Sequence, residues 1–530
     1  MAAPLSLEFS KSYGDCEKYP QNLIYKASYK GVLKAYEERI ETALPRFLTQ
    51  ALDDIEIHFR QWDATNSKFT DHQVTNEDQL RTHLGEVAHP NPATGKPTWS
   101  LIPRRDPACR FIHLYADNST KPLKITPRML KRLFSYHQVM PSIIDFLAVF
   151  AHPPQQRELG FSGFFNQTIL SYRNQQSTQP AAAQPPNVPR GPRVAALGRS
   201  GLQYQLCYNL KRVVLKAGTL KDPYKDQDWS IQQCQFHHQF DVIEGTMLWV
   251  SAKGGLNDYR DKVLELTGGT AGIPEDIEMG DRVQRFQGSL TVHLMNCHWA
   301  VDEWRNYISY LETAIMKETR HTTSGPWINE EFKPRKLQTV QLYEEKASSA
   351  IMILEGNIDV MTELRTFYQR LLLNPGFNMA TECIEANESF VQHINDMINI
   401  FATHKRRAKV LVDISENRKN LLLQKLQSLA TKKMEDLTTM GYREAIFMKV
   451  IAAGTFVFLP ATFVSTLFST DIVKYQNTTN GSASYSWPAL RIWLEFSVPL
   501  TVGTLIIGFL GFWLADQQRK KKMPPSAYDD

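Results

Sequence analysis

Two charge-free apolar stretches near the C-terminus constrain this chain more than any other feature. Val450 to Phe468 and Phe496 to Leu514 each contain 19 residues without a charged side chain. As a helix, each stretch spans roughly 28 Å, close to the hydrocarbon thickness of a bilayer. A buried helix of a soluble protein rarely lacks a polar face over that length. The sequence therefore predicts a transmembrane hairpin, with a first helix at 448–470, an outside loop at 471–491 and a second helix at 492–515.

The charges that flank the two spans predict their orientation. Basic residues gather before the first span and after the second: Lys432, Lys433, Arg443, Lys449, Arg519, Lys520, Lys521 and Lys522. The loop between the spans has only two basic residues, Lys474 and Arg491. The positive-inside rule therefore places both termini in the cytosol. Asn477 and Asn480 begin sequons in that loop and are candidate glycosylation sites. We predict a two-pass integral membrane protein, in the plasma membrane or in an internal membrane.

The first span carries polar side chains along one face. At 100° per residue, seven positions fall together: Met448, Ile451, Thr455, Leu459, Thr462, Thr466 and Thr470. In one interpretation the hydroxyl groups bond back to the helix or to a neighbouring helix. In the other, the stripe faces a water-filled pore built from several copies of this helix. Pro460 fits both, because it frees a backbone carbonyl in either case.

Long helices are expected before the first span. Residues 334–373 read as one helix, which an Asn-Pro-Gly sequence at 374–376 ends. From about Met379 the chain continues into the first span with apolar residues in steps of three and four. We assign residues 331–447 to long helices and to a stalk that leads into the membrane. A helical hairpin that only packs on the soluble domain is the alternative.

Residues 1–330 predict a cytosolic α/β domain. Five strands are expected, at 110–115, 203–208, 234–242, 246–251 and 289–294. A helix is expected at 299–319. Residues 174–200 are rich in proline, glutamine and alanine without periodicity, which predicts a disordered insertion. The predicted fold class is α+β: this α/β domain, a long stalk helix, a C-terminal two-helix transmembrane hairpin and a cytosolic tail at 516–530.

Composition argues against other protein classes. A net charge of +5 over 530 residues does not indicate a nucleic-acid partner. The six cysteines lack a framework spacing and fit reduced thiols. Nucleotide, Ser/His/Asp and paired-carboxylate motifs with the context that catalysis needs are missing from the sequence. We therefore predict neither an enzyme nor a bound cofactor.

Two sets of side chains in the sequence could bind metal. The first could supply four zinc ligands: Cys234, His237, His238, Cys297 and His298. Alternation along the strand at 234–242 would send neighbouring side chains to opposite faces, so ordinary packing is favoured. The second set consists of acidic pairs that could belong to an intracellular metal sensor: Asp53-Asp54, Glu330-Glu331 and Glu344-Glu345. The sequence does not choose among these pairs.

The first span, MKVIAAGTFVFLPATFVSTLF from Met448 to Phe468, resembles that of the CorA family of divalent-cation channels, and most closely the fungal CorA-like branch. The resemblance rests on the Met-Lys start and on the Phe-Leu-Pro-x-Thr-Phe core at 458–463. It also rests on the charged helix before the span, the short outside loop and the lysines after the second span. Weaker similarity extends to residues 127–150 and 234–251.

The resemblance implies a homopentamer with the first span around a central pore that carries Mg²⁺ or a related cation such as Zn²⁺. Four positions of the stripe coincide with pore positions of the family: Met448, Ile451, Leu459 and Thr462. The stripe adds Thr455 and Thr466. Ser469, Thr470 and Asp471 replace the Gly-Met-Asn selectivity motif of the family. A ring of Asp471 carboxylates at the mouth would bind metal cations more tightly than an amide ring.

We therefore predict a channel or transporter for divalent cations that is gated through its cytosolic stalk. The alternative is a non-conducting CorA-like sensor or scaffold that has lost the selectivity motif. The replaced motif leaves open which ion passes, in which direction, and whether the protein conducts.

Overall fold

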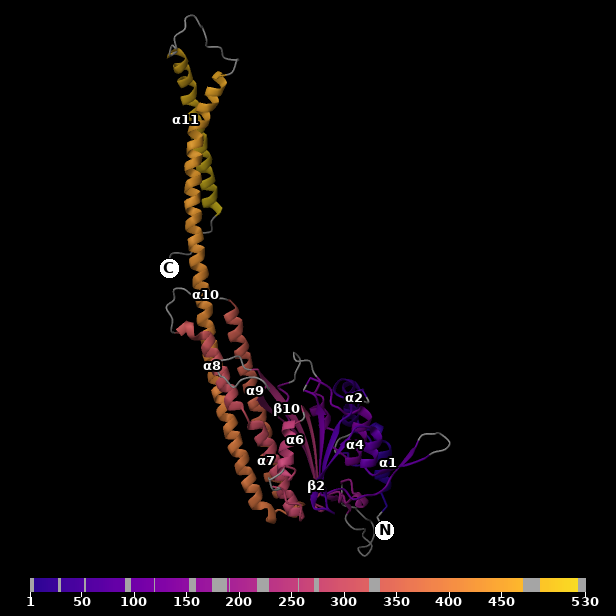
Figure 1. Ribbon diagram of the computed structural model, residues 1–530. Coiled ribbons are helices and arrows are strands. Elements are labelled where there is room, and N and C mark those ends of the chain that lie inside the picture. Colours follow the sequence, from indigo (N-terminus) through magenta and orange to yellow (C-terminus); the bar gives the residue numbers. More distant parts are fainter. Residues whose placement is uncertain are drawn as a thin grey trace. The chain divides into compact units, whose positions relative to one another are not determined.

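The computed structural model describes residues 4–26, 30–51, 54–90, 97–118, 120–151, 159–173, 188–189, 191–216, 228–255, 257–270, 276–323, 334–469 and 487–522. Contacts divide the chain into two compact units, Met1–Leu421 and Leu422–Asp530. The first unit is a sheet with helices on both faces (Figure 1). The second contains two apolar helical segments. The predicted domain boundaries at residues 330 and 447 stay predictions.

A seven-stranded sheet forms the centre of the first unit, in the order β2-β1-β5-β11-β10-β9-β6. Its strands are β1 (Ile57–Asp63), β2 (Lys68–Val74), β5 (Cys109–Ala116), β6 (Phe164–Ile169), β9 (Gln203–Leu215), β10 (Trp229–Asp241) and β11 (Met247–Gly254). All described neighbours are antiparallel except β5 and β11, which are parallel. Two small hairpins pair β3 (Glu86–His89) with β4 (Thr98–Leu101) and β7 (Tyr172–Arg173) with β8 (Val188–Pro189). Four of the five predicted strands are confirmed.

One face of the sheet is covered by the N-terminal helices. These are α1 (Leu7–Gly14), η1 (Cys16–Lys18), α2 (Lys30–Phe47), α3 (Glu77–His83), α4 (Pro127–His137) and α5 (Ile143–Leu147). Helix α4 has strong local signals, because the Thr126 side chain caps Met129 N–H and Pro127 occupies the first turn. It ends at Gln138, which adopts a left-handed conformation with φ of 55°. Apolar residues of α4 and α5 form a buried core with Ile112, Leu114 and Val250 of the sheet.

The opposite face is covered by longer helices. These are α6 (Asn257–Leu266), α7 (Arg282–Val301), α8 (Trp304–Thr323), α9 (Pro334–Leu372), η6 (Thr381–Cys383) and the first part of α10 (Ile384–Ser469). A capping box between Asp281 and Gln284 begins α7. Side chains of α7, α8, α9 and α10 form a second core with Tyr204, Phe236 and Trp249. The sheet therefore separates two hydrophobic cores.

The strand predicted at 289–294 is wrong, because these residues lie inside α7. The segment alternates over a short distance, but its buried residues follow the helical spacing of three and four: Phe286, Leu290, His293, Cys297 and Ala300. The helix predicted at 299–319 is present as α8, but its predicted start is wrong, because residues 299–301 still belong to α7. Helix α7 ends at Val301 and α8 begins at Trp304, and Glu303 between them has a φ of 66°.

The disordered insertion predicted at 174–200 is wrong at its C-terminal end. Residues 174–187 and 190 lie outside the described residues. Residues 191–200 include a short helix, η5 (Ala195–Leu197), and bury Val194, Leu197 and Arg199. Pro192 is buried in this segment, so proline content alone does not mark the residues that lack packing.

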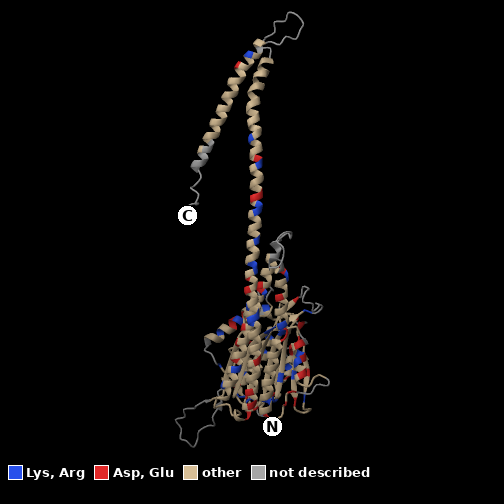
Figure 2. Ribbon diagram, turned by 90° about the vertical axis from the view of Figure 1, so that its left-hand side faces the viewer, with Lys and Arg blue, Asp and Glu red and all other residues tan. Residues whose placement is uncertain are grey.

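The predicted long helix is present as α10, which has 86 residues from Ile384 to Ser469. Pro460 lies inside it, and Pro499 lies inside α11 (Trp487–Lys522). Each of the two helices contains a segment long and apolar enough to cross a membrane. In Figure 2 the ribbons of α10 and α11 carry no Lys, Arg, Asp or Glu colour along the charge-free stretches 450–468 and 496–514. The fold is a mixed α/β unit, a long helix and two C-terminal apolar helices.

Candidate pore-lining site

The hydroxyl groups of the first span bond to their own helix backbone. The Thr455 Oγ1 hydroxyl donates to the Ile451 carbonyl at 2.7 Å. Those of Thr462 and Thr466 donate to Leu459 and Phe463 at 2.9 and 2.8 Å. A hydroxyl has one hydrogen to donate and two lone pairs. Once the hydrogen is used in the helix, each oxygen presents only lone pairs outward.

All six predicted pore positions are exposed on the single chain: Met448, Ile451, Thr455, Leu459, Thr462 and Thr466. Helix α11 contacts α10 mainly through α10 residues outside the stripe, such as Ser465 and Phe468. Trp493 Nε1 donates to Ser465 Oγ at 3.0 Å, and the rings of Phe468 and Phe496 lie 6.4 Å apart. Val464 is only 4% exposed. The stripe is therefore available to a partner helix or to water.

One edge of the stripe borders α11. A groove of about 470 Å³ is lined by Leu459, Thr462 and Thr466 of α10 and by Leu500 and Thr504 of α11. The Trp493–Ser465 hydrogen bond that aligns the two helices was not anticipated. The sequence shows a tryptophan near the start of the second span and a serine in the first. Neither residue type indicates which partner its side chain will bond to.

Most of the predicted selectivity mouth lies outside the described residues. Ser469 ends α10, and its hydroxyl donates to the Thr466 carbonyl at 2.8 Å. Thr470, Asp471, and the sequons at Asn477 and Asn480 are not among the described residues. Their roles stay predictions.

The zinc ligands considered above do not come together. Cys234, His238 and Cys297 face the helices on one side of the sheet, whereas His237 points to the other side. His298 lies on the exposed side of α7. In the described part of the chain, no group of three or more His, Cys, Asp or Glu side chains is placed to hold a metal ion.

In the acidic pairs considered as metal sensors, Glu344 and Asp54 lie beside lysine side chains, and three other members lie outside the described residues. Both Glu344 carboxylate oxygens accept from Lys419 Nζ, at 2.8 and 3.0 Å, which joins α9 to α10. Asp54 lies 3.5 Å from Lys124 Nζ. Asp53, Glu330 and Glu331 lie outside the described residues.

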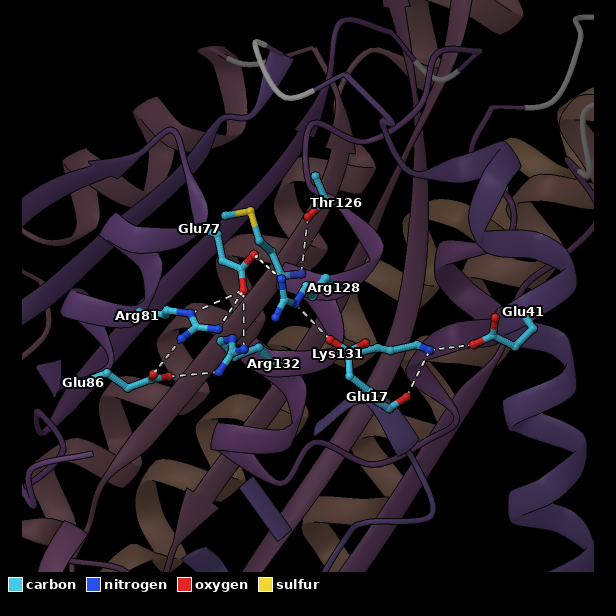
Figure 3. Close-up of polar contacts among 10 residues, drawn as sticks. Glu17, Glu41, Glu77, Arg81, Glu86, Thr126, Arg128, Lys131 and Arg132 are labelled. Carbon is cyan, nitrogen blue, oxygen red and sulfur yellow. Dashed lines mark hydrogen bonds and ion pairs between the residues drawn. The ribbon is translucent and has the colours of Figure 1, made fainter. Parts of the chain in front are cut away.

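A network of ion pairs surrounds α4 (Figure 3), and it was not predicted from the sequence. Arg132 contacts Glu86 at 3.1 Å and Glu77 at 3.4 Å. Arg81 contacts the same two carboxylates, at 3.5 and 3.2 Å. The Tyr13 hydroxyl also donates to Glu86. Positive and negative groups are matched, so the network holds α1, α3, α4 and β3 together.

The two apolar helices and the mixed α/β unit are typical of a membrane-anchored protein with a folded N-terminal region. The family model of CorA-like transporters matches residues 11–323. Because this match covers more than half of the chain, the chain belongs to the CorA-like transporters. With two helices fit to cross a bilayer, it is an integral membrane protein. The match falls on the N-terminal region, whereas the resemblance in the sequence was strongest in the C-terminal hairpin.

No curated protein matches the chain significantly. Among the solved structures that match, two illustrate how low the sequence identity is. The full-length CmaX protein is 12% identical, with a TM-score of 0.32, over 85% of this chain and 97% of that one. The complete CorA magnesium transporter from Methanocaldococcus jannaschii is 10% identical, with a TM-score of 0.32, over 86% and 97%. The family assignment rests on the family model.

Proposed function

We propose that this protein is a channel or transporter for divalent metal cations, with the first span of several copies lining the pore. The observation that carries the proposal is the acceptor-only stripe of the first span. Thr455, Thr462 and Thr466 are exposed, and each has donated its hydroxyl hydrogen to the helix. Oxygen lone pairs favour cations or the water hydrogens of hydrated cations. Membership of the CorA-like transporters supports the same class.

The finer features of the proposal follow the resemblance. The oligomer is a homopentamer, both termini are cytosolic, and the ion is Mg²⁺ or Zn²⁺. The stalk part of α10 transmits the state of the N-terminal unit to the pore. Asp471 binds the ion at the outer mouth, where a carboxylate ring holds cations more tightly than amides do. A resident cofactor and a catalytic activity form no part of the proposal.

A non-conducting sensor or scaffold is the second candidate, and one sequence observation favours it. Ser469, Thr470 and Asp471 stand where the family resemblance expects Gly-Met-Asn. A carboxylate ring that binds a divalent cation too tightly would stop conduction, because conduction requires the ion to leave as well as to enter.

Ion flux into liposomes that contain the purified protein tests the proposal. Dyes for Mg²⁺ and Zn²⁺ report the flux of wild type, Thr462→Leu and Thr501→Leu. Thr501 of α11 is the matched control, because its hydroxyl also donates to its own helix, at 2.7 Å to the Ser497 carbonyl. We expect Thr462→Leu to reduce flux at least tenfold and Thr501→Leu to leave it within twofold. Equal flux in all three proteins would contradict the pore assignment.

Asp471→Asn separates the two candidate functions. A change in rate or in the Mg²⁺/Zn²⁺ preference would place Asp471 on the path of the ion. If wild type is silent and Asp471→Asn conducts, the acidic ring plugs a working pore. If both are silent in liposomes that hold correctly assembled protein, the sensor or scaffold is the better description.

A further inference from the structure

Basic residues gather at the end of the hairpin where the chain enters the first span and leaves the second. Helix α11 continues to Lys522, past Leu514, which is the last residue of its candidate membrane span. Residues 519–522 read Arg-Lys-Lys-Lys. At the helical rise their backbone lies roughly 7 to 12 Å beyond Leu514. The headgroup layer extends about 5 to 8 Å beyond the hydrocarbon, so these residues follow directly on its outer boundary.

Two further basic residues lie at the same end, on α10. Lys449 directly precedes the charge-free stretch of the first span, and its Nζ lies 5.7 Å from the centre of the Phe512 ring of α11. This contact puts Lys449 at the depth of the last turns of the second span. Arg443 lies about 9 Å from Lys449 along α10, on the stalk side. Both basic side chains are exposed.

The charge at this end is not balanced. We call residues 440–449 and 515–522 the basic collar; it contains six basic residues and two acidic ones, Glu444 and Asp516. Within the described part of the chain, no carboxylate lies at ion-pair distance from Arg443 or Lys449. The collar therefore keeps a surplus of positive charge that the single chain does not neutralise.

The opposite end of the hairpin carries no such surplus. Residues 469–495 contain two acidic and two basic residues: Asp471, Lys474, Arg491 and Glu495. Two of them pair with each other, since Arg491 Nε donates to Glu495 Oε1 at 3.1 Å. The positive surplus is thus confined to one end of the hairpin and meets one leaflet of the bilayer.

A surplus of this kind beside a membrane span attracts negatively charged lipid. Clusters of four or more Lys and Arg residues directly next to a span attract phosphatidylserine and phosphoinositides, and the attraction fades within a Debye length of the surface. Zwitterionic headgroups have no net charge to offer. If the basic residues served only to orient the hairpin during insertion, the folded protein would show no preference between the two kinds of lipid.

We propose that the basic collar binds the headgroups of anionic phospholipids, such as phosphatidylserine, in preference to zwitterionic ones. Residues 519–522 contribute most of the charge, and Arg443 and Lys449 add to it from α10. A protein that transports no ion would still bind these lipids, so lipid binding is tested separately from conduction.

Spin-labelled lipids measure this preference in the full chain. The protein is reconstituted in phosphatidylcholine liposomes with a trace of spin-labelled phosphatidylserine or phosphatidylcholine, and electron paramagnetic resonance gives the fraction of each label that the protein immobilises. We expect about a threefold preference for phosphatidylserine at about 0.15 M salt. It should fall toward equality at about 1 M salt, where the Debye length shortens from about 8 to 3 Å. Equal immobilisation of both labels at the lower salt would overturn the proposal.

A pair of double variants locates the binding surface. Lys521→Gln combined with Lys522→Gln should reduce the preference at least about twofold, because it removes half of the charge at 519–522. Lys432→Gln combined with Lys433→Gln is the matched control. It also replaces two adjacent lysines, which are exposed on α10 but lie about 25 Å from Lys449 along the helix, well beyond the Debye length.

The control should keep the wild-type preference. A preference that survives unchanged in the Lys521 and Lys522 double variant, or that falls equally in both double variants, would mean that the collar does not bind the lipid. The salt dependence of the wild-type protein does not rely on any variant, so a double variant that fails to fold leaves that measurement decisive.

Discussion

Lys211 illustrates the buried polar residues on the face of β9 and β10 that meets α4 and α5. Its side chain is fully buried, and its Nζ donates to the Phe161 carbonyl and to Ser162 Oγ. No carboxylate is paired with it among the described residues. Asn357 of α9 bonds to both the N–H and the carbonyl of Lys211, at 3.0 and 2.7 Å. Asn357 thus fixes the backbone of Lys211, while Phe161 and Ser162 hold its amine.

The free energy of unfolding should depend on pH through Lys211. Burial lowers the pKa of its amine from 10.5 to about 7. Between about pH 7 and 10.5 the unfolded chain binds the proton and the native chain does not, so stability rises with pH by up to about 1.4 kcal/mol per unit. Below about pH 7 the amine is charged in both states, and the full cost of burial remains.

Lys211→Met should remove this contribution and stabilise the protein more at pH 6 than at pH 10. Unfolding midpoints of the full chain across that range measure the effect. Lys216→Met is the control, because Lys216 is exposed and pairs with Asp228. If both variants keep the wild-type dependence on pH, Lys211 is not its source.

At the residue level, sequence reasoning found the stripe but missed the polar cavity at the end of the sheet, which Arg199, Gln203 and Gln239 line. The stripe follows from helix periodicity alone, so Thr455, Thr462 and Thr466 could be selected without a structure. Arg199 could not, because it lay in a segment predicted to be disordered. Gln203 and Gln239 come together only through the pairing of β9 with β10. Long-range pairing leaves no local signal in the sequence.

At the level of elements, α4 depends on charge pairing as well as on its apolar face. Glu86 is 4% exposed and accepts from Tyr13, Arg81 and Arg132. Glu86→Gln should lower the free energy of unfolding by about 3 kcal/mol, because it leaves buried guanidiniums short of a counter-charge. Chemical denaturation of the full chain in detergent measures the change.

The matched control for Glu86→Gln is Glu17→Gln. Glu17 Oε1 lies 3.0 Å from Arg128 Nε, and the two side chains are 58% and 57% exposed. An exposed pair contributes at most about 1 kcal/mol. Similar losses in the two variants would mean that burial of the network does not matter.

Element types were predicted well where one period dominated. The strands at 203–208 and 234–242 are flanked by polar or turn-forming residues, and α9 begins and ends close to its expected limits. The segment 289–294 failed because alternation over six residues also fits one face of a helix. The parallel pairing of β5 with β11 joins segments separated by more than 100 residues and could not be anticipated.

At the level of the whole molecule, the first unit includes a substantial part of α10. Phe390, Ile394, Phe401 and Leu411 are at most 3% exposed and belong to the core beside the sheet. A fragment of residues 1–421 should therefore unfold cooperatively without the membrane segments. A fragment of residues 1–373 should aggregate, because it exposes the surface that these side chains cover. Urea unfolding followed by circular dichroism distinguishes the two; equal behaviour would contradict this role of α10.

In the pore that we propose, the back-bonded hydroxyls of the first span would have a consequence for permeation. Threonine has no proton to lose over the physiological pH range, and its hydroxyl hydrogen is held by the helix. A pore wall of such hydroxyl oxygens would favour cations over anions although it carries no formal charge. Acidification should leave its discrimination against anions unchanged. Any acid-sensitive change of permeability would then originate at a carboxylate such as Asp471, so a pH titration of permeability can distinguish the wall from the mouth.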